Sequence, residues 1–349
     1  MGFLKYKFGV LAVCVAFCLV VACNKVTEMP TPYKLQIPSS LPQAIVAAPQ
    51  NPMTVEGVEL GRHLFYEPLL SGNNQLSCGS CHKPNFAFSD STIQFSKGTV
   101  GQLGTRNAMP LFNLAFATNF FWDGGAANLE SQVLGPIENP LEMAESLPRM
   151  LNDLRQTSKY PNLFRLAFGD TAITTPRVMK AVAQFMKTIL SGDSKYDKYK
   201  NGVVQLTDSE LRGLVIFQDE TTGDCVHCHV LGSTFTDFEY RNNGLDDVPN
   251  DKGRERITLN TLDRGKFKTP TLRNIGLTAP YMHDGRFANL DEVLQHYNQG
   301  FSVAPTTDPI ISTKAKNRMS APNLADLKAF LLTLTDDDFY KNPNFLKPH

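Results

Sequence analysis

The chain lacks an excess of charge of either sign, because its 349 residues include 34 Lys and Arg and 34 Asp and Glu. Binding to nucleic acid requires a basic field, so nucleic acid is excluded as a partner. The sequence also lacks any run of sustained apolar–polar alternation, the pattern that indicates β-strands. We therefore expect a mainly α fold, on a chain long enough for two domains of ordinary size.

Long apolar runs are also rare, and the clearest one stands at the start of the chain. Lys5 and Lys7 precede the run FGVLAVCVAFCLVVAC at 8–23, which is the layout of a secretory signal. An uncleaved membrane anchor is the alternative. Small Ala22 directly before Cys23 favours cleavage between them, as in a bacterial lipoprotein signal, after which Cys23 would carry lipid.

Cysteine is scarce, with seven in the chain, and the signal accounts for three of them. We expect a signal peptide over 1–22, which removes Cys14 and Cys18, and a lipid on Cys23. The polar, proline-rich stretch 23–45 suits an extended tether. The mature protein is thus expected on the periplasmic side, attached to a membrane through its lipid.

The remaining four cysteines form two copies of one pattern, CGSCH at 78–82 and CVHCH at 225–229. No cysteine is left for a structural disulfide, although an exported protein could form one. The residues of the two motifs are Cys78, Cys81, His82, Cys225, Cys228 and His229.

Cys-x-x-Cys-His is typical of covalent attachment of a c-type haem. The two thiols add to the haem vinyl groups, and the following histidine binds the iron. A zinc site would use all four cysteines together, but the two pairs lie 147 residues apart. A redox dithiol of the thioredoxin kind would need a βαβ setting, which the sequence lacks. The motifs therefore predict two covalent haems c.

The distance between the motifs indicates two haem domains, which we place at 46–195 and 196–349. The polar, glycine-containing stretch 191–202 would lie at their boundary. Apolar residues at helical spacing, or helix start and stop signals, indicate helices on both sides. The expected helices cover 175–190, 207–218 with a capping box of Thr207 and Glu210, 289–300 and 322–334.

Over nearly all of its expected mature length the chain resembles the bacterial dihaem cytochrome c peroxidases and the related MauG-type dihaem oxidases. The longest matching segments are LGRHLFYEPLLSGNNQLSCGSCH at 60–82, FFWDGGAANLESQVLGPIENPLEM at 120–143 and GKFKTPTLRNIGLTAPYMHDGRFANLDEVLQHYNQG at 265–300. RNAMPLFN at 106–113 matches as well. The resemblance implies two cytochrome c-like domains, an N-terminal haem that meets peroxide and a C-terminal haem that stores and passes electrons.

The sequence favours an open coordination position at the N-terminal haem. No histidine occurs between His82 and Trp122. Many peroxidases that the chain resembles carry a removable distal histidine in this loop, and Gly98 is near the matching place. Met109 is the one sulfur ligand available in the loop. An open position can bind and activate a ligand, whereas a filled one suits electron transfer.

The resemblance places Tyr297 where the capped peroxidases use a methionine to bind the C-terminal haem iron. Tyr297 lies on the apolar face of the helix expected over 289–300. An inward tyrosine is otherwise an ordinary core residue. Met319 and Met282 are competing ligands, and His296 is less favoured because it lies off that face. A tyrosinate oxygen would stabilise the oxidised iron.

Cleavage of a peroxide O–O bond requires a group that moves a proton from the near oxygen to the far one, as a carboxylate can. The resemblance implies that Glu142 and Gln132 lie on the open side of the N-terminal haem in this role. From the residues alone, no glutamate in this stretch stands out. Glu138 and Glu130 are the alternatives, and both suit solvated charges.

Three further assignments rest mainly on the resemblance. Trp122, the single tryptophan, suits core packing and also matches an aromatic stepping stone for electrons between the haems. Asn107 and the carbonyls of Thr278 and Pro280 match a calcium site, with the oxygen ligands that Ca²⁺ accepts. His283 matches a histidine near the second haem.

The sequence therefore predicts a cytochrome c peroxidase, which reduces hydrogen peroxide with electrons from a small c-type cytochrome or a similar donor. One alternative is a MauG-like dihaem oxidase that modifies a partner protein. The other alternative is a dihaem electron carrier without catalysis. For each of these functions, the partner could include a second copy of the chain in a homodimer.

Overall fold

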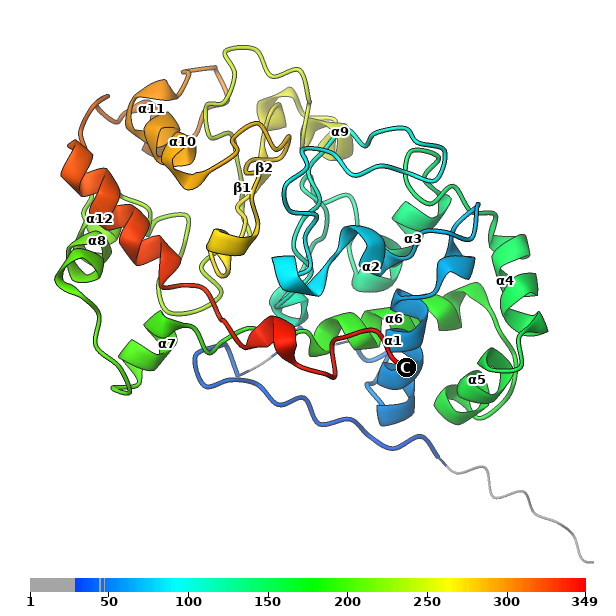
Figure 1. Ribbon diagram of the computed structural model, residues 1–349. Helices are drawn as coiled ribbons and strands as arrows, with labels where there is room; N and C mark the ends of the chain where they lie inside the picture. The colour runs from blue at the N-terminus through cyan, green and yellow to red at the C-terminus, as the bar shows by residue number, and fades with distance from the viewer. Residues whose placement is uncertain (1–28, 44, 47) are drawn as a thin grey trace, which may run out of the picture.

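The computed structural model of the protein describes residues 29–43, 45–46 and 48–349 (Figure 1). The expected signal peptide, Cys23 and the start of the expected tether lie outside the described residues. Within the described part, no helix is long and apolar enough to cross a membrane.

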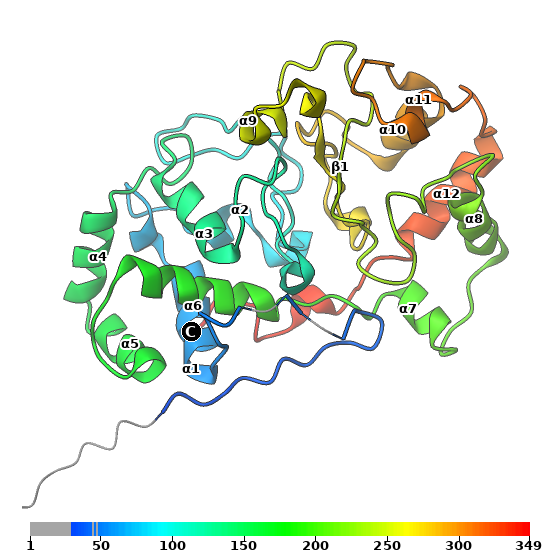
Figure 2. The same cartoon turned by 180° about the vertical axis from the view of Figure 1, so that it is seen from behind.

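The described chain is mainly helical, which confirms the expected fold class. Its paired strands are β1 (Tyr240–Arg241) and β2 (Phe267–Lys268), which form one small antiparallel sheet. The helices form two groups that lie side by side (Figures 1 and 2). The first group consists of α1 (Val55–Phe65), α2 (Cys78–Cys81), α3 (Leu129–Glu138), α4 (Leu147–Gln156), α5 (Tyr160–Phe168) and α6 (Thr175–Thr188). The second consists of α7 (Lys195–Lys200), α8 (Asp208–Gln218), α9 (Glu255–Thr258), α10 (Leu290–Gln295), α11 (Pro309–Ser312) and α12 (Ala321–Leu332).

The N-terminal core is built around the crossing of α1 and α6. Gly61 brings the two backbones close together, because a Cβ atom at this position would lie 1.9 Å from the carbonyl oxygen of Ala181. Leu60, Leu64 and Phe65 of α1 are completely buried against α6. The prediction of a helix over 175–190 is confirmed, and its burial on most sides explains its high apolar content.

The C-terminal core has the same kind of crossing, between α8 and α12. A Cβ atom on Gly213 would lie 2.0 Å from the carbonyl oxygen of Asp326. Thr207 and Glu210 form the expected capping box at the start of α8, which confirms the helix predicted there. Each core therefore rests on one close helix pair that a glycine permits.

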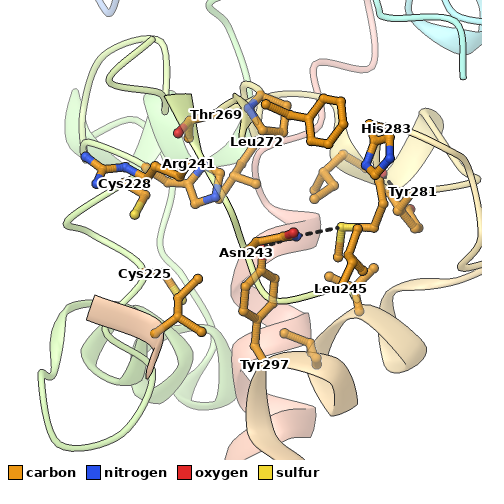
Figure 3. A pocket seen from close by; sticks show the side chains of 18 of the residues that line it. Cys225, Cys228, Arg241, Asn243, Leu245, Thr269, Leu272, Tyr281, His283 and Tyr297 are labelled. Carbon is orange, nitrogen blue, oxygen red and sulfur yellow. Dashed lines mark hydrogen bonds between the residues drawn. The ribbon is translucent and has the colours of Figure 1, made fainter. Parts of the chain in front are cut away.

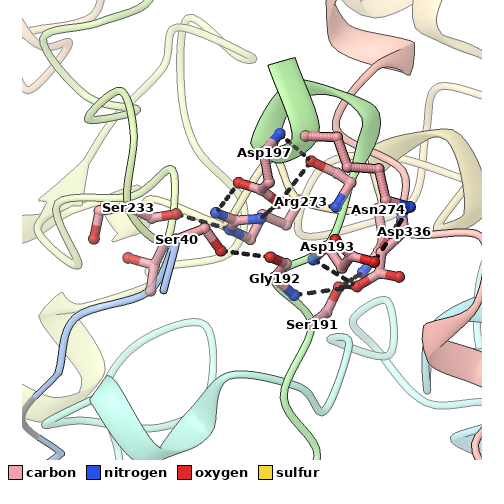
Figure 4. Close-up of polar contacts among 12 residues, drawn as sticks. Ser40, Ser191, Gly192, Asp193, Asp197, Ser233, Arg273, Asn274 and Asp336 are labelled. Carbon is pink, nitrogen blue, oxygen red and sulfur yellow. Dashed lines mark hydrogen bonds and ion pairs between the residues drawn. The ribbon is translucent and has the colours of Figure 1, made fainter. Parts of the chain in front are cut away.

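Most of the stretch 191–199 is buried or half-buried and forms a joint between the two groups of helices, whereas 200–202 are exposed (Figure 4). Asp197 forms a two-bond ion pair with Arg273, with N–O distances of 2.7 and 3.0 Å. Asp336 accepts hydrogen bonds from the hydroxyl of Ser191 and the backbone N–H of Gly192, both at 3.1 Å. Polar residues are buried here because each one has a partner.

Both ends of the described chain depart from the domain bounds that the sequence suggested, which were 46–195 and 196–349. Leu41 is buried against Leu190 and Phe116, with Leu35, Ile37 and Ile45 packed beside it, and the hydroxyl of Ser40 donates to the carbonyl of Gly192. The folded body thus begins before residue 46. The tail after Asp336 returns to the N-terminal core, and the end of the chain lies beside α1 in Figure 1.

Candidate haem sites

The second Cys-x-x-Cys-His motif opens into a cavity of about 210 Å³ (Figure 3). Cys225, Cys228 and His229 line it together with Tyr297 and many apolar side chains. Both cysteines are free thiols, as attachment to a cofactor requires. A mostly apolar cavity with a few polar groups is the usual form of a cofactor site.

His229 is prepared to bind a metal through one nitrogen. Its Nδ1 lies 3.3 Å from the carbonyl oxygen of Phe235, so Nδ1 carries the proton and Nε2 keeps its lone pair. Desolvation lowers the pKa of His229 to about 4, although the bond to Phe235 opposes this shift. The ring is therefore neutral at pH 7.

Asn243 is a polar centre of this cavity that the sequence did not reveal. Its Nδ2 atom lies 3.2 Å from the phenol oxygen of Tyr297 and 3.3 Å from the sulfur of Met282. Its backbone oxygen lies 3.0 Å from Nε2 of His296. Two neighbouring asparagines in a loop give no sequence signal for such a role.

The structure corrects the expected orientation of His296. The expected helix over 289–300 is α-helical for Leu290–Gln295 and continues as a π-helix over His296–Gly300. The wider turn directs His296 inward, where it is buried against Asn243 and not placed on the outer face.

Tyr297 also lines the cavity, where desolvation raises the pKa of its phenol to about 12 and the hydrogen bond from Asn243 acts in the opposite direction. Met282 and Met319 line the same cavity. The structure thus brings all three candidate iron ligands together with His229. The choice among them stays a prediction.

The first motif has the same local plan. Cys78 and Cys81 begin and end the short helix α2, and both are free thiols. Desolvation raises the pKa of Cys78 to about 12, so the thiol form is held. His82 places its Nδ1 2.9 Å from the carbonyl oxygen of Phe88, and desolvation lowers its pKa. This ring is neutral too, with Nε2 free for a metal.

Of the two residues expected to act on peroxide, Glu142 lies near this motif, and Gln132 belongs to α3. Gln132 is buried, and its Oε1 has no hydrogen-bond partner, which is rare for a buried polar atom. Glu142 is close enough to the thiols of Cys78 and Cys81 to raise the pKa of both. Desolvation raises the pKa of Glu142, while a 2.7 Å hydrogen bond from Asn139 lowers it.

An internal repeat shows what occupies the position of Tyr297 in the first half. Before α3 and before α10 the chain forms the same antiparallel bridge, and Asn128 and Asn289 cap the two helices in the same way. Eight residues after these caps stand Pro136 and Tyr297. Proline has no side-chain atom that can bind iron, so the repeat leaves the first site without the corresponding ligand.

The loop around Gly98, where the resemblance led us to look for a distal histidine, packs closely. A Cβ atom on Gly98 would lie 2.2 Å from the carbonyl oxygen of Leu141, so no side chain fits at this position. The N–H of Thr99 donates to the carbonyl of Glu142 at 2.9 Å. Met109 presents its backbone carbonyl to the His82 ring. The loop thus supports the backbone of Glu142.

Trp122 connects the two halves. It comes from the first half of the chain, but it lines the cavity of the second motif. The indole N–H of Trp122 donates to the carbonyl of Asn107 at 2.9 Å, and the backbone carbonyl of Trp122 accepts from the N–H of Lys268 at 2.7 Å. The ring is almost fully buried, as both expected roles require.

The expected calcium residues Asn107, Thr278 and Pro280 all line this cavity as well. His283 is buried close by, with its ring stacked 3.6 Å from that of Phe267. Among the described residues, no group of three or more His, Cys, Asp or Glu could hold a metal ion. A calcium site here would therefore depend on backbone and amide oxygens.

Two Cys-x-x-Cys-His motifs on a mainly helical chain, each with a neutral histidine and a free ring nitrogen, are typical of proteins with two covalent haems. A family model described as di-haem cytochrome c peroxidase matches residues 55–205. The chain belongs to this family of di-haem cytochrome c peroxidases and MauG proteins, which implies two c-type haems.

The similar proteins carry both kinds of name. The methylamine utilization protein MauG of Methylophilus methylotrophus is 32% identical, over 88% of this chain and 89% of its own length. The cytochrome c551 peroxidase of Nitrosomonas europaea is 33% identical, over 85% of this chain and 84% of its own. A crystal structure of a MauG-like protein associated with microbial copper homeostasis matches with a TM-score of 0.83 and 32% identity, over 90% of this chain and 99% of that one.

Proposed function

We propose that the protein is a dihaem peroxidase that reduces hydrogen peroxide to water with electrons from a small c-type cytochrome or a similar donor. The observation that supports the proposal is the internal repeat, which puts Pro136, a residue that cannot bind iron, where the second half has Tyr297. In the same helix, α3, the buried Gln132 has an unpaired oxygen. An iron without a second protein ligand can bind peroxide, which an enzyme needs and an electron carrier does not.

Two haems c would be held by the thiols of the two motifs, with His82 and His229 as iron ligands, in two cytochrome c-like domains at 46–195 and 196–349, with the tail after Asp336 packed on the first of them. When bound, the haem at the first motif supplies the redox chemistry that peroxide cleavage requires. Tyr297 is the proposed second ligand at the other motif.

Glu142 would act as the proton-transferring group. As a carboxylate it accepts the proton of the near peroxide oxygen and returns it to the far oxygen, which leaves as water. Gln132 would orient the peroxide through its unpaired amide oxygen, which can accept the far hydroxyl. Two electrons and two protons complete the conversion of one peroxide into two waters.

Trp122 would provide the electron path, because it belongs to the first half and lines the cavity of the second. We also propose a Ca²⁺ ion held by the amide of Asn107 and the carbonyls of Thr278 and Pro280, which lie along the same wall. Export to the periplasm and a lipid on Cys23 complete the proposal.

A MauG-like oxidase that modifies a partner protein is the second candidate. Tyr297 favours it, because a tyrosinate ligand would make the second haem a poor acceptor of electrons from a mild donor. The names of the relatives include both activities.

The deciding experiment is a steady-state assay with peroxide and reduced cytochrome c, on protein whose two haems have been counted by mass spectrometry after denaturation. Peroxide-dependent oxidation of the cytochrome supports the peroxidase. No turnover, together with a high-spin ferric EPR signal from one haem, supports the oxidase. Two low-spin signals would support an electron carrier and overturn both enzyme proposals.

The two motifs provide matched controls for the haem count. The double variant Cys78→Ala with Cys81→Ala should lose one covalent haem, and Cys225→Ala with Cys228→Ala should lose the other. If either double variant keeps both haems, covalent attachment at that motif is wrong.

A further inference from the structure

We propose that the C-terminal tail, residues 336–346, is a positioning element for the iron-binding histidine of the first site. The tail would act through Phe339 and Phe345, which hold Phe88, and Phe88 in turn accepts the hydrogen bond of His82. This inference rests on the proposed haem at the first motif. It assigns a role in that site to the last residues of a chain whose preceding helices belong to the other core.

Phe88 is the central residue of this arrangement. Its carbonyl oxygen lies 2.9 Å from Nδ1 of His82, and its ring is completely buried. Its backbone φ is +57°, an unusual conformation for a bulky residue, which persists only where the surroundings enforce it. The direction of the carbonyl therefore depends on what packs against the ring.

The tail supplies two of the contacts that surround this ring. The ring centroid of Phe339 lies 5.9 Å from that of Phe88, and the centroid of Phe345 lies 6.4 Å away. The two tail rings also contact each other at 5.7 Å. Phe65 of α1 packs from another side, at 6.0 Å. Aromatic pairs at such distances stabilise one another beyond simple burial.

The tail is attached at both ends, so the two rings have a fixed position. At the start of the tail, the carboxylate of Asp336 accepts hydrogen bonds from Ser191 and Gly192 of the joint. It also accepts from the N–H of Phe339 at 3.2 Å. At its end, the phenol of Tyr66 donates to the carbonyl of Phe345 at 2.6 Å, and Arg62 donates to the carbonyl of Pro343 at 3.1 Å. Arg62 belongs to α1, and Tyr66 directly follows it.

The second site has the same local plan without the tail. Phe235 has a φ of +53°, and its carbonyl lies 3.3 Å from Nδ1 of His229. Its ring packs against Tyr196 and Phe217 of its own core, at 5.6 and 6.3 Å. The C-terminal haem is thus an internal control within the same molecule.

The bond from Nδ1–H to a carbonyl makes the imidazole a stronger electron donor to a metal and fixes the orientation of its ring. Weakening this bond at His82 should therefore favour the reduced iron. The expected result is an upward shift of the midpoint potential of the N-terminal haem, with a lower iron–histidine stretching frequency in the resonance Raman spectrum.

The test uses the full chain with both haems attached and compares Phe339→Ala and Phe345→Ala with Leu346→Ala. Leu346 belongs to the same tail but is exposed, so its variant is the matched control. Both phenylalanine variants should shift the potential and the stretching frequency of the N-terminal haem alone, and Phe345→Leu should shift them less. Leu346→Ala should shift neither haem.

An unchanged N-terminal haem in Phe339→Ala and Phe345→Ala would overturn the inference, and so would an equal shift of both haems, which indicates general loosening. If the alanine variants fail to accumulate, Phe345→Leu decides by the same criteria. Failure of the proposed peroxidase function is distinguishable, because these spectra do not depend on turnover. Hydrogen exchange of the amides at 82–88, without any assay of the haem, should be faster in the phenylalanine variants than in Leu346→Ala.

Discussion

The side-chain amide of Asn243 lies between the phenol oxygen of Tyr297, at 3.2 Å, and the sulfur of Met282, at 3.3 Å. One donor group therefore contacts two of the three candidate iron ligands of the second site. An N–H group that donates to an anionic ligand removes electron density from it. Asn243 is thus placed to adjust whichever of the two atoms binds the iron.

Replacing Asn243 by Leu removes this donor at similar volume. If Tyr297 is the ligand, its phenolate becomes a stronger donor, and the C-terminal haem should become harder to reduce. Hydrogen bonds to charged groups contribute about 1.5–3 kcal/mol, which sets the scale of the effect. A spectroelectrochemical titration measures it, and the N-terminal haem is the control. A potential that rises or stays constant would contradict the prediction.

Replacing Tyr297 by Phe should change the spectrum and the potential of the C-terminal haem, because the phenol oxygen is lost. Tyr297→Met should raise the potential and add a sulfur-to-iron charge-transfer band, since a thioether favours the reduced iron. A wild-type spectrum that already has this band would instead identify Met319 or Met282 as the ligand.

Replacing Glu142 by Gln should keep both haems but slow the reaction with peroxide by roughly 10²–10⁴, the usual contribution of general acid–base catalysis. Stopped-flow absorbance measures this rate. Replacement of Glu138 by Gln is the matched control and should have little effect. If the control slows the reaction and Glu142→Gln does not, the role belongs to Glu138.

The pH dependence of the same reaction tests the environment of Glu142. Desolvation raises the pKa of its carboxyl, and protonation removes the base, so the rate should fall as the pH decreases through this raised value. The amide of Asn139 donates to the carboxylate and lowers the pKa. Asn139→Ala should therefore move the acid limb to higher pH. A limb that stays in place, or that persists in Glu142→Gln, would contradict this assignment.

The buried ion pair of Asp197 and Arg273 should dominate the stability of the joint. Arg273→Met leaves the carboxylate of Asp197 buried without its partner, which typically costs about 3–5 kcal/mol of unfolding free energy. Urea unfolding measures this loss. Adding Asp197→Leu should recover part of it, because the two residues contact each other and their effects are not additive.

The same pair predicts how stability depends on pH. Desolvation opposes the shift, but the hydrogen bonds and charge of Arg273 hold the pKa of Asp197 below its usual value. The contribution is therefore complete above the unfolded pKa of about 3.9 and is lost as the pH falls through the lower folded value. Asp197→Asn should flatten this part of the pH profile of unfolding free energy.

The sequence predicted those features that depend on neighbouring residues. The capping box at Thr207 and Glu210 and the apolar spacing of 175–190 specify α8 and α6 locally, so both predictions were confirmed. The two Cys-x-x-Cys-His motifs likewise contain their own geometry, because the two thiols of each motif are three residues apart in a short helix or turn.

The features that the sequence could not predict depend on distant partners. Asp197 and Arg273 are 76 residues apart, so the sequence showed that the stretch 191–202 is polar but not that Asp197 is buried in an ion pair. The inward direction of His296 depends on one wide helical turn, which periodicity cannot detect. The contact of Asn243 with Tyr297 could not be predicted either, because the fold brings together two residues that are far apart in the sequence.

The return of the tail has a consequence for the order in which the protein can fold. Phe339 and Phe345 complete the N-terminal core, yet the ribosome adds them only after all the helices of the second core. The N-terminal half therefore cannot reach its final packing until the second half has been synthesised, even though its own helices are complete much earlier. A nascent chain stalled just before Asp336 should leave Phe88 accessible to solvent, and extension of the chain past Phe345 should close this half of the protein.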